Sequence, residues 1–274
     1  MAFNSGIACF LLRERVMTME KKQLKTEADC TAVTGRVHSF QSLGAVDGPG
    51  LRTVVFLQGC PLRCVYCHNP DTWPTDGGEV LTVQEVFEKV LRYRPYFGKT
   101  GGVTVSGGEP LLQWHFVAEL FRVMRQAGIH TALDTSGIGD MEGARAVLAH
   151  TDLVLCDLKF ATEDAYAQYC GGSLRAVLSF LKLTEELHVP LWIRHVVVPG
   201  LTDGEAHAQA IAKLGRQFSN LEKLELLPFQ TLCQSKYDAL GIPFPLHGCP
   251  PCSDETIQEL YGVIGQKGTC SNEE

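Results

Sequence analysis

The sequence Cys60-Pro-Leu-Arg-Cys64-Val-Tyr-Cys67 follows the apolar run Val54-Val-Phe-Leu57 and places three thiols within eight residues. A structural zinc site needs four ligands, usually in two separated pairs, and no second pair lies nearby in the sequence. A four-iron cluster that is held by only three thiolates keeps one iron open for an outside ligand. The spacing therefore predicts a [4Fe-4S] cluster on Cys60, Cys64 and Cys67, with one iron available for substrate chemistry.

Two other interpretations of these cysteines remain open at this point. Cysteine is often a small buried apolar residue, so all three could belong to a core. The segment Cys64-Val-Tyr-Cys67-His68 also matches the haem attachment pattern C-x-x-C-H. Haem attachment would leave Cys60 unused, and it is a feature of exported proteins.

Six apolar, β-branched runs alternate with longer amphipathic stretches, which predicts a parallel sheet covered by helices. Strands are expected at Thr53–Leu57, Gly102–Val105, His130–Leu133, Leu153–Cys156, Leu191–Val198 and Lys223–Leu227. Helices are expected at Thr82–Arg92, Trp114–Gln126, Met141–Ala149, Ser173–Leu187, Gly204–Phe218 and Asp254–Ile264. Periodicity does not separate a closed barrel from an open sheet, but only six strands are available.

Polar or glycine-bearing segments follow the ends of these strands. After the cysteine loop they are Ser106-Gly-Gly-Glu109, Asp134-Thr-Ser-Gly137, Asp157-Leu-Lys159, Val198-Pro-Gly200 and Pro228-Phe-Gln230. Parallel strands in α/β folds carry their functional residues at their carboxyl ends. We therefore expect one active site at one edge of the sheet.

Length and composition are those of a single large domain. The net charge is −7 with no long basic stripe, which argues against a nucleic acid partner. An odd number of cysteines, 11, at irregular spacing favours a reducing compartment over a disulfide framework. The apolar segment Gly6–Leu12 is too short to span a membrane and lacks the basic flank of a signal peptide, so we expect a cytoplasmic protein. Residues 1–33 show no periodicity and are expected to be a loose extension before a domain at 34–270.

The motifs resemble those of a known family. The C-x3-C-x2-C pattern with an aromatic residue before its last cysteine is that of the radical S-adenosylmethionine enzymes. Val46-Asp-Gly-Pro-Gly50 and Cys67-His-Asn-Pro-Asp-Thr-Trp73 resemble the activating enzymes of glycyl radical enzymes. No cysteine occurs between Cys67 and Cys156, so the ferredoxin-like insert of many members is absent, as in those that act on pyruvate formate-lyase. The resemblance implies a partial (β/α)6 TIM-like barrel that is open on one side.

The resemblance also implies roles for individual residues. Gly107, Gly108 and Glu109 match the motif that holds the amino group of S-adenosylmethionine, although two glycines before a helix are often only a turn. Asp134, Thr135 and Asp157 match positions that help to bind a monovalent cation, although an aspartate at such a junction is commonly a helix cap. The remaining expected residues are Lys159 and Arg194 in catalysis, Tyr66, Val196 and Gln230 at the cofactor, and Asp47 and His68 at the substrate. Gln230 stands where the family often has a histidine, so acid–base chemistry there is doubtful.

The expected reaction is reductive cleavage of S-adenosylmethionine, followed by hydrogen abstraction from a backbone glycine of another enzyme. The expected partners are a glycyl radical enzyme of the pyruvate formate-lyase type and a flavodoxin- or ferredoxin-type reductant, with the chain acting as a monomer. A radical enzyme for a small molecule and an iron–sulfur electron carrier or sensor are the alternatives. The resemblance assigns no role to Cys233, Cys249, Cys252 and Cys270, and Cys249-Pro-Pro-Cys252 lies in a segment whose prolines predict an irregular loop.

Overall fold

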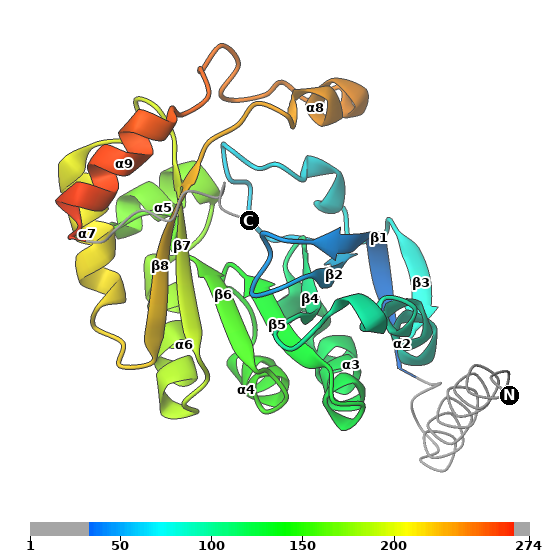
Figure 1. Ribbon diagram of the computed structural model, residues 1–274. Coiled ribbons are helices and arrows are strands. Elements are labelled where there is room, and N and C mark those ends of the chain that lie inside the picture. Colours follow the sequence, from blue (N-terminus) through cyan, green and yellow to red (C-terminus); the bar gives the residue numbers. More distant parts are fainter. Residues whose placement is uncertain (1–32, 266–274) are drawn as a thin grey trace, which may run out of the picture.

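The computed structural model describes residues 33–265, and these form one open sheet with helices packed around it (Figure 1). The strand order is β3-β1-β2-β4-β5-β6-β7-β8. The strands are β1 (Thr34–Gly44), β2 (Arg52–Leu57), β3 (Glu79–Thr82), β4 (Gly102–Gly107), β5 (His130–Thr135), β6 (Leu153–Asp157), β7 (Leu191–Val197) and β8 (Leu221–Pro228). The helices are α2 (Val83–Leu91), α3 (Trp114–Gln126), α4 (Met141–Leu148), α5 (Glu163–Cys170), α6 (Leu174–Glu186), α7 (Glu205–Gly215), α8 (Gln234–Leu240) and α9 (Asp254–Val263).

The six strands expected from the sequence are β2 and β4 to β8, and all five of their pairings are parallel. The sheet does not close, because β3 and β8 lie at its two edges. The predicted class, a partial barrel of six βα units that is open on one side, is therefore confirmed. The expected extension at residues 1–33 lies outside the described residues except for Val33.

The antiparallel strands β1 and β3 were not expected. β1 pairs with both β2 and β3, and its register with β2 is broken between Val37 and Ser39 and again between Gln41 and Gly44. Each break shifts which side chains face the core, so β1 lacks the regular alternation that identifies a strand from sequence. The short helices α5 and α8 also escaped prediction, because α5 buries only Tyr166 and Cys170 and α8 buries only Tyr237.

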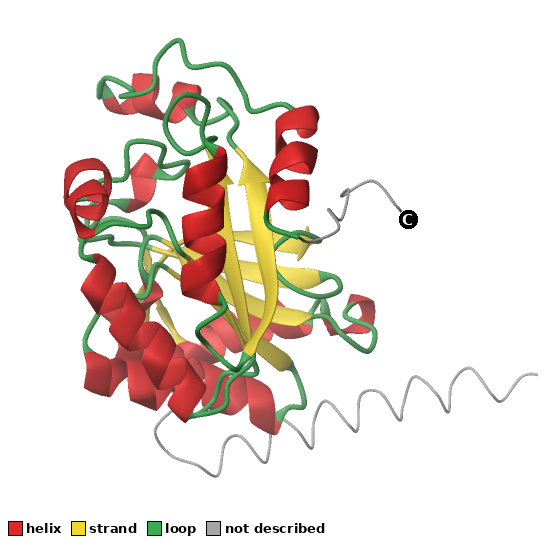
Figure 2. Cartoon of the chain, turned by 90° about the vertical axis from the view of Figure 1, so that its left-hand side faces the viewer, coloured by secondary structure: helices red, strands yellow, loops and turns green. Residues whose placement is uncertain are grey.

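The helices expected from periodicity bury one face each. α3 buries Phe116, Leu120, Phe121 and Met124, as its spacing predicts, and Gly128 ends the turn after it with φ of 68°. Each such side chain stabilises the fold by roughly 1.5–3 kcal/mol. α3 packs beside α4, and α4 packs beside α6, so one face of the sheet is covered (Figure 2). No helix among residues 33–265 is long and apolar enough to cross a membrane.

Arg52 is a fully buried cation at the start of β2. Its guanidinium donates to Thr104 Oγ1 at 2.7 Å, to the carbonyl oxygen of Val103 at 2.7 Å and to that of Pro49 at 3.0 Å. The side chain thus ties the loop before β2 to the neighbouring strand β4. Removing it would leave several buried acceptors without a donor, which is costly.

We predict that Arg52→Met lowers the free energy of unfolding by about 3 kcal/mol, measured by urea denaturation, because its buried acceptors lose their donor. Arg175→Met is the matched control, since the Arg175 side chain is 87% exposed and meets Glu163 only at 3.9 Å. This control should change stability by no more than about 0.5 kcal/mol. Equal effects of the two substitutions would contradict the structural role of Arg52.

Candidate active site

The carboxyl ends of the parallel strands surround a pocket of about 300 Å³. It brings together most of the residues that the sequence predicted for the site. These are Asp47, Cys64, Tyr66, Cys67, His68, Gly107, Gly108, Asp134, Thr135, Asp157, Lys159, Arg194 and Val196. Phe56, Asn69, Ser106 and Ser136 also line it without having been assigned a role. Only their positions in the sequence could have identified them, because each lies near the end of a predicted strand or within a motif that was named for other residues.

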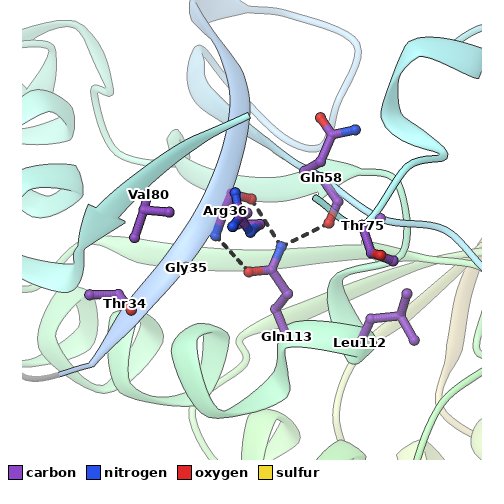
Figure 3. Close-up of a pocket in the computed structure, with 9 residues that line it drawn as sticks. Thr34, Gly35, Arg36, Gln58, Thr75, Val80, Leu112 and Gln113 are labelled. Atoms are coloured by element: carbon purple, nitrogen blue, oxygen red, sulfur yellow. Dashed lines mark hydrogen bonds between the residues drawn. The ribbon is translucent and has the colours of Figure 1, made fainter. Parts of the chain in front are cut away.

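The base of the cysteine loop is fixed by a glutamine bridge (Figure 3). Gln113 accepts from the backbone N–H of Arg36 at 2.7 Å, and its amide donates to the carbonyl oxygens of Arg36 and Gln58 at 2.9 Å each. Arg36 belongs to β1 and Gln58 directly follows β2, so one side chain joins both strands immediately before the cysteines. These residues line a separate pocket of about 480 Å³.

Gly108 allows the loop after β4 to approach the cysteine loop. A Cβ atom on Gly108 would lie 2.1 Å from the carbonyl oxygen of Gly59, a distance at which atoms overlap. The N–H of Glu109 donates to that same oxygen at 2.8 Å. Gly108 therefore does more than allow a turn, because the contact between the two loops leaves no room for a side chain at this position.

The three cysteine thiols differ in their surroundings. Burial raises the pKa of Cys60 to about 12 and that of Cys67 to about 11. A hydrogen bond from the Cys170 thiol, opposed by burial, lowers the pKa of Cys64 to about 7. Cys64 and Cys67 line the pocket, and Cys60 lies close enough that their negative charges would raise its pKa further.

This donor set fits an iron–sulfur cluster. Among residues 33–265, no three His, Cys, Asp or Glu side chains are arranged to hold a single metal ion. A four-iron cluster does not require such convergence, because each cysteine binds a different iron. The Tyr66 hydroxyl lies beside the thiols, buried and without a hydrogen-bond partner, and Tyr66 lines the same pocket. A buried orphan of this kind indicates that a polar ligand belongs in the pocket.

Glu109 differs from the expectation. It is fully buried and does not line the pocket. Its carboxylate accepts hydrogen bonds from Thr135 Oγ1 at 2.5 Å, from the Ser136 N–H at 2.8 Å, from Ser136 Oγ at 2.5 Å and from the Leu111 N–H at 3.0 Å. With four donors in place the carboxylate has no lone pair directed at a ligand. It joins the loop after β4 to the loop after β5 instead of facing the pocket.

Arg194 on β7 joins Asp157, at the end of the adjacent strand β6, to Asp134 on β5, the next strand beyond. It donates to Asp134 at 2.5 Å and to Asp157 at 3.1 Å. Lys159 approaches the other oxygen of Asp157 at 3.0 Å, and Ser106 Oγ donates to Asp134 at 2.6 Å. Side chains from four successive parallel strands, together with Lys159 just after β6, therefore form one network.

The network shifts the pKa values of both aspartates. Burial would raise the pKa of Asp157, but attraction to Lys159 and Arg194 outweighs burial and lowers it to about 2. Burial raises the pKa of Asp134, and Arg194 only partly offsets this. Neither aspartate is a helix cap, since the N-caps of α4 and α5 are Asp140 and Thr162.

The two residues expected at the substrate, Asp47 and His68, both line the pocket. Asp47 lines the pocket, and burial, together with repulsion from Asp134, raises its pKa. His68 also lines the pocket, and its ring nitrogen lies 3.0 Å from the carbonyl oxygen of Gln230. Gln230 itself does not line the pocket. The structure therefore brings its backbone carbonyl group, and not its side-chain amide, to the pocket residues.

The segment after β8 covers the cysteine loop. Lys236 on α8 donates to Asn69 Oδ1 at 2.8 Å and pairs with Asp71 at 3.1 Å, and Tyr237 Oη donates to the carbonyl oxygen of Cys67 at 3.2 Å. Figure 1 shows α8 above this loop, far from α8 in sequence. Further along the segment, Cys249 and Cys252 are both free thiols.

Comparison with known proteins agrees with this site. The family model described as "Radical SAM superfamily" matches residues 54–210, which include the cysteine loop and five of the six parallel strands. The structure superimposes on a radical SAM methyltransferase from Sphaerobacter thermophilus with a TM-score of 0.58 at 17% identity, over 80% of this chain and 65% of that one. It also matches a domain of pyruvate-formate lyase-activating enzyme from Bacteroides vulgatus with a TM-score of 0.51 at 25% identity, over 62% of this chain and 98% of that one.

Curated relatives are more similar still. The chain is 47% identical to the pyruvate formate-lyase-activating enzyme of Clostridium pasteurianum, over 83% of this chain and 96% of the relative. It is 42% identical to the pyruvate formate-lyase 1-activating enzyme of Escherichia coli K12, over 86% and 98%. The chain therefore belongs to the radical SAM superfamily and, within it, to the family of pyruvate formate-lyase-activating enzymes. Its cofactors are a [4Fe-4S] cluster, as the cysteine spacing predicted, and S-adenosylmethionine, as the family resemblance implied.

We predict that Arg194→Met destabilises the fold by about 3–5 kcal/mol, because Asp134 and Asp157 lose their shared buried cation. Without Arg194 the pKa of Asp134 rises further above its unfolded value. A group with a raised folded pKa loses its contribution as the pH rises through that pKa, so the deficit should grow from about pH 5 to about pH 8. Asp157, whose pKa is about 2 in the intact protein, is charged throughout this pH range. It therefore adds no pH dependence to the free energy of unfolding of the wild-type protein there.

Urea denaturation at several pH values measures this deficit. Arg145→Met is the control, since Arg145 pairs with Glu186 at 3.4 Å on an exposed surface and should cost no more than about 0.5 kcal/mol at any pH. A deficit for Arg194→Met that stays constant with pH would show that the aspartates do not depend on Arg194 for their charge.

Proposed function

We propose that this chain activates pyruvate formate-lyase by generating a glycyl radical on it. The observation that carries the proposal is one pocket where the cysteine loop meets the Asp134–Arg194–Asp157 network, in a chain 47% identical to an activating enzyme across 96% of that enzyme. When bound, the cluster and S-adenosylmethionine supply an adenosyl carbon radical that can abstract hydrogen from a peptide glycine.

The chain's own residues would hold and shield this chemistry. Cys60, Cys64 and Cys67 would ligate the cluster, and binding iron would overcome the raised pKa values of Cys60 and Cys67, because metal binding releases thiol protons. The Tyr66 hydroxyl, which lacks a partner, would meet a polar group of the ligand. Glu109 would act indirectly, by positioning the Thr135–Ser136 backbone through its four hydrogen bonds.

The charge of the pocket supports S-adenosylmethionine as its ligand. The carboxylates that line it are Asp47, Asp134 and Asp157, and the cations are Lys159 and Arg194, so three negative charges meet two positive ones and leave one negative charge. S-adenosylmethionine carries a sulfonium, an ammonium and a carboxylate, and hence one net positive charge. The cofactor would balance these five side chains, but the cluster ligands Cys64 and Cys67 line the same pocket and lie outside this count. A monovalent cation at Asp134, Thr135 and Asp157 therefore stays a prediction.

The substrate would enter at the mouth of the pocket. Asp47 lies on the loop before β2 and His68 on the loop that α8 covers, so a glycine-bearing loop of the partner would pass between them. A flavodoxin- or ferredoxin-type protein would supply the electron. We further propose that the protein acts in the cytoplasm as a monomer until it meets its partner.

Electron paramagnetic resonance tests the proposed function. Pyruvate formate-lyase incubated anaerobically with this protein, S-adenosylmethionine and a reductant should show a stable glycyl radical signal, and Cys64→Ala in place of the wild-type protein should abolish it. Cofactor cleavage to methionine and 5′-deoxyadenosine without any radical on the partner would favour a small-molecule substrate instead.

We predict that Asp47→Ala lowers radical formation on the partner about tenfold or more while partner-free cleavage of S-adenosylmethionine falls much less, because Asp47 faces the substrate entrance. Chromatography of 5′-deoxyadenosine and spin counting measure the two yields. Asp76→Ala, at an exposed loop position, is the control and should leave both yields unchanged. Equal losses of both yields in Asp47→Ala would assign this residue to cofactor binding.

A further inference from the structure

His195 is a buried histidine that the predicted site did not include. It lies on β7 directly after Arg194, and its side chain is buried, with the residue only 1% exposed. Its ring nitrogen Nδ1 lies 2.8 Å from the carbonyl oxygen of Leu158. A carbonyl oxygen can only accept, so Nδ1 carries the proton and donates it. Leu158 stands between Asp157 and Lys159, and both of these line the pocket. The hydrogen bond therefore ends in the middle of an active-site segment.

The His195 side chain continues the contact between β6 and β7 beyond the end of their ladder. The parallel pairing of these strands stops at Asp157 and Arg194, while β7 continues to Val197 (Figure 1). The N–H of Leu158 donates to the carbonyl oxygen of Arg194 at 2.9 Å. The carbonyl oxygen of Leu158 accepts from the His195 ring instead of extending the ladder. One side chain thus anchors the first residue after β6.

The surroundings of His195 keep its ring neutral and leave it a single hydrogen bond. Burial lowers its pKa to about 4, so the ring carries one proton at neutral pH, and the contact with Leu158 assigns that proton to Nδ1. The ring of His207 lies 5.1 Å away between centroids. Within residues 33–265 neither of the two Nε2 atoms has a hydrogen-bond partner. The bond to Leu158 is therefore the polar contact that orients the His195 ring.

Lys159 is held through its backbone as well as through its ammonium group. Its N–H donates to Tyr166 Oη at 2.8 Å, and Tyr166 is fully buried. Its Nζ lies 3.0 Å from Asp157 Oδ2 and 5.9 Å from the centre of the Tyr66 ring. Where this ammonium group sits depends on the backbone segment that Tyr166 and His195 hold from two sides.

Lys159 is also the pocket cation that is better placed to meet an anionic group. The other cation, Arg194, donates through Nε to Asp157 and through Nη2 to Asp134. An ammonium group has three protons to donate, and Asp157 accepts one of those of Lys159. Lys159 therefore keeps donors for a ligand carboxylate, such as that of S-adenosylmethionine.

We infer that His195 is a positioning residue for Lys159, and that it raises the affinity of the pocket for S-adenosylmethionine. Without the His195 donor the buried carbonyl oxygen of Leu158 loses its partner, which costs free energy unless the backbone moves to find another. Such a movement displaces Lys159, which is the next residue. The inference rests on the proposed binding of S-adenosylmethionine in this pocket, and it adds a residue outside the pocket lining.

Isothermal titration calorimetry with S-adenosylmethionine and the anaerobically reconstituted protein, without reductant, measures this affinity. His195→Leu and His195→Asn form a matched pair, because leucine and asparagine have the same branched shape and only asparagine can donate to Leu158. The dissociation constant should rise about tenfold in His195→Leu, which is the effect of losing one hydrogen bond to a charged group. It should stay within about threefold of the wild-type value in His195→Asn.

Two controls separate positioning from stability. Thr151 is a buried residue whose Oγ1 donates to the carbonyl oxygen of Val147 at 2.9 Å, outside the site. Thr151→Val removes a buried donor of the same kind, so it should lower stability and leave the affinity unchanged. In a Lys159→Met background, His195→Leu should cost little further affinity, because its effect acts through Lys159.

Urea denaturation of the same samples establishes which variants fold. Should His195→Leu not fold, His195→Phe takes its place with the same expected loss, because it keeps a ring of similar size without the donor. Equal affinities of the His195→Leu or His195→Phe protein and the His195→Asn protein would overturn the inference alone. An undiminished effect of His195→Leu in the Lys159→Met background would also overturn it. A wild-type protein that does not bind S-adenosylmethionine would contradict the proposed function and the inference together.

Discussion

The bridge from Arg194 to Asp134 and Asp157 is the interaction on which the site depends. Three neighbouring parallel strands each contribute one member, so the pairing fixes the relative positions of their carboxyl ends. Two buried carboxylates this close to each other would otherwise repel, and one would take up a proton. With Arg194 and Lys159 present both can stay charged, and a polar pocket persists inside an apolar sheet.

The cysteine loop is attached to this framework at several independent points. Gly108 permits backbone contact with Gly59, Gln113 joins β1 to the end of β2, and the end of α5 grips the loop around Cys64. Each of these contacts ends on a backbone N–H or carbonyl group, and hydrogen bonds to the backbone hold a loop more rigidly than contacts between exposed side chains do. A loop fixed in this way presents its thiols in one arrangement before any cluster binds.

The sequence predicted the parts of the fold that follow from simple periodicity. Buried parallel strands are almost continuously apolar, so β2 and β4 to β8 were evident, and their carboxyl ends identified the pocket. β1 was not, because two register breaks disrupt its alternation. The sequence also does not show which way a side chain points within a turn. Glu109 follows the glycines of its motif, yet its carboxylate faces Thr135 and Ser136. The contact between the end of α5 and the cysteine loop could not be predicted, since only the folded chain brings these two segments together.

If Cys60, Cys64 and Cys67 hold a four-iron cluster, its fourth iron would be available to S-adenosylmethionine. Mössbauer spectroscopy of protein reconstituted with ⁵⁷Fe, recorded with and without S-adenosylmethionine, tests this most directly. We expect one iron in each cluster to change its spectrum on addition of the cofactor while the other three do not. A cluster whose irons are all unaffected by S-adenosylmethionine would contradict it.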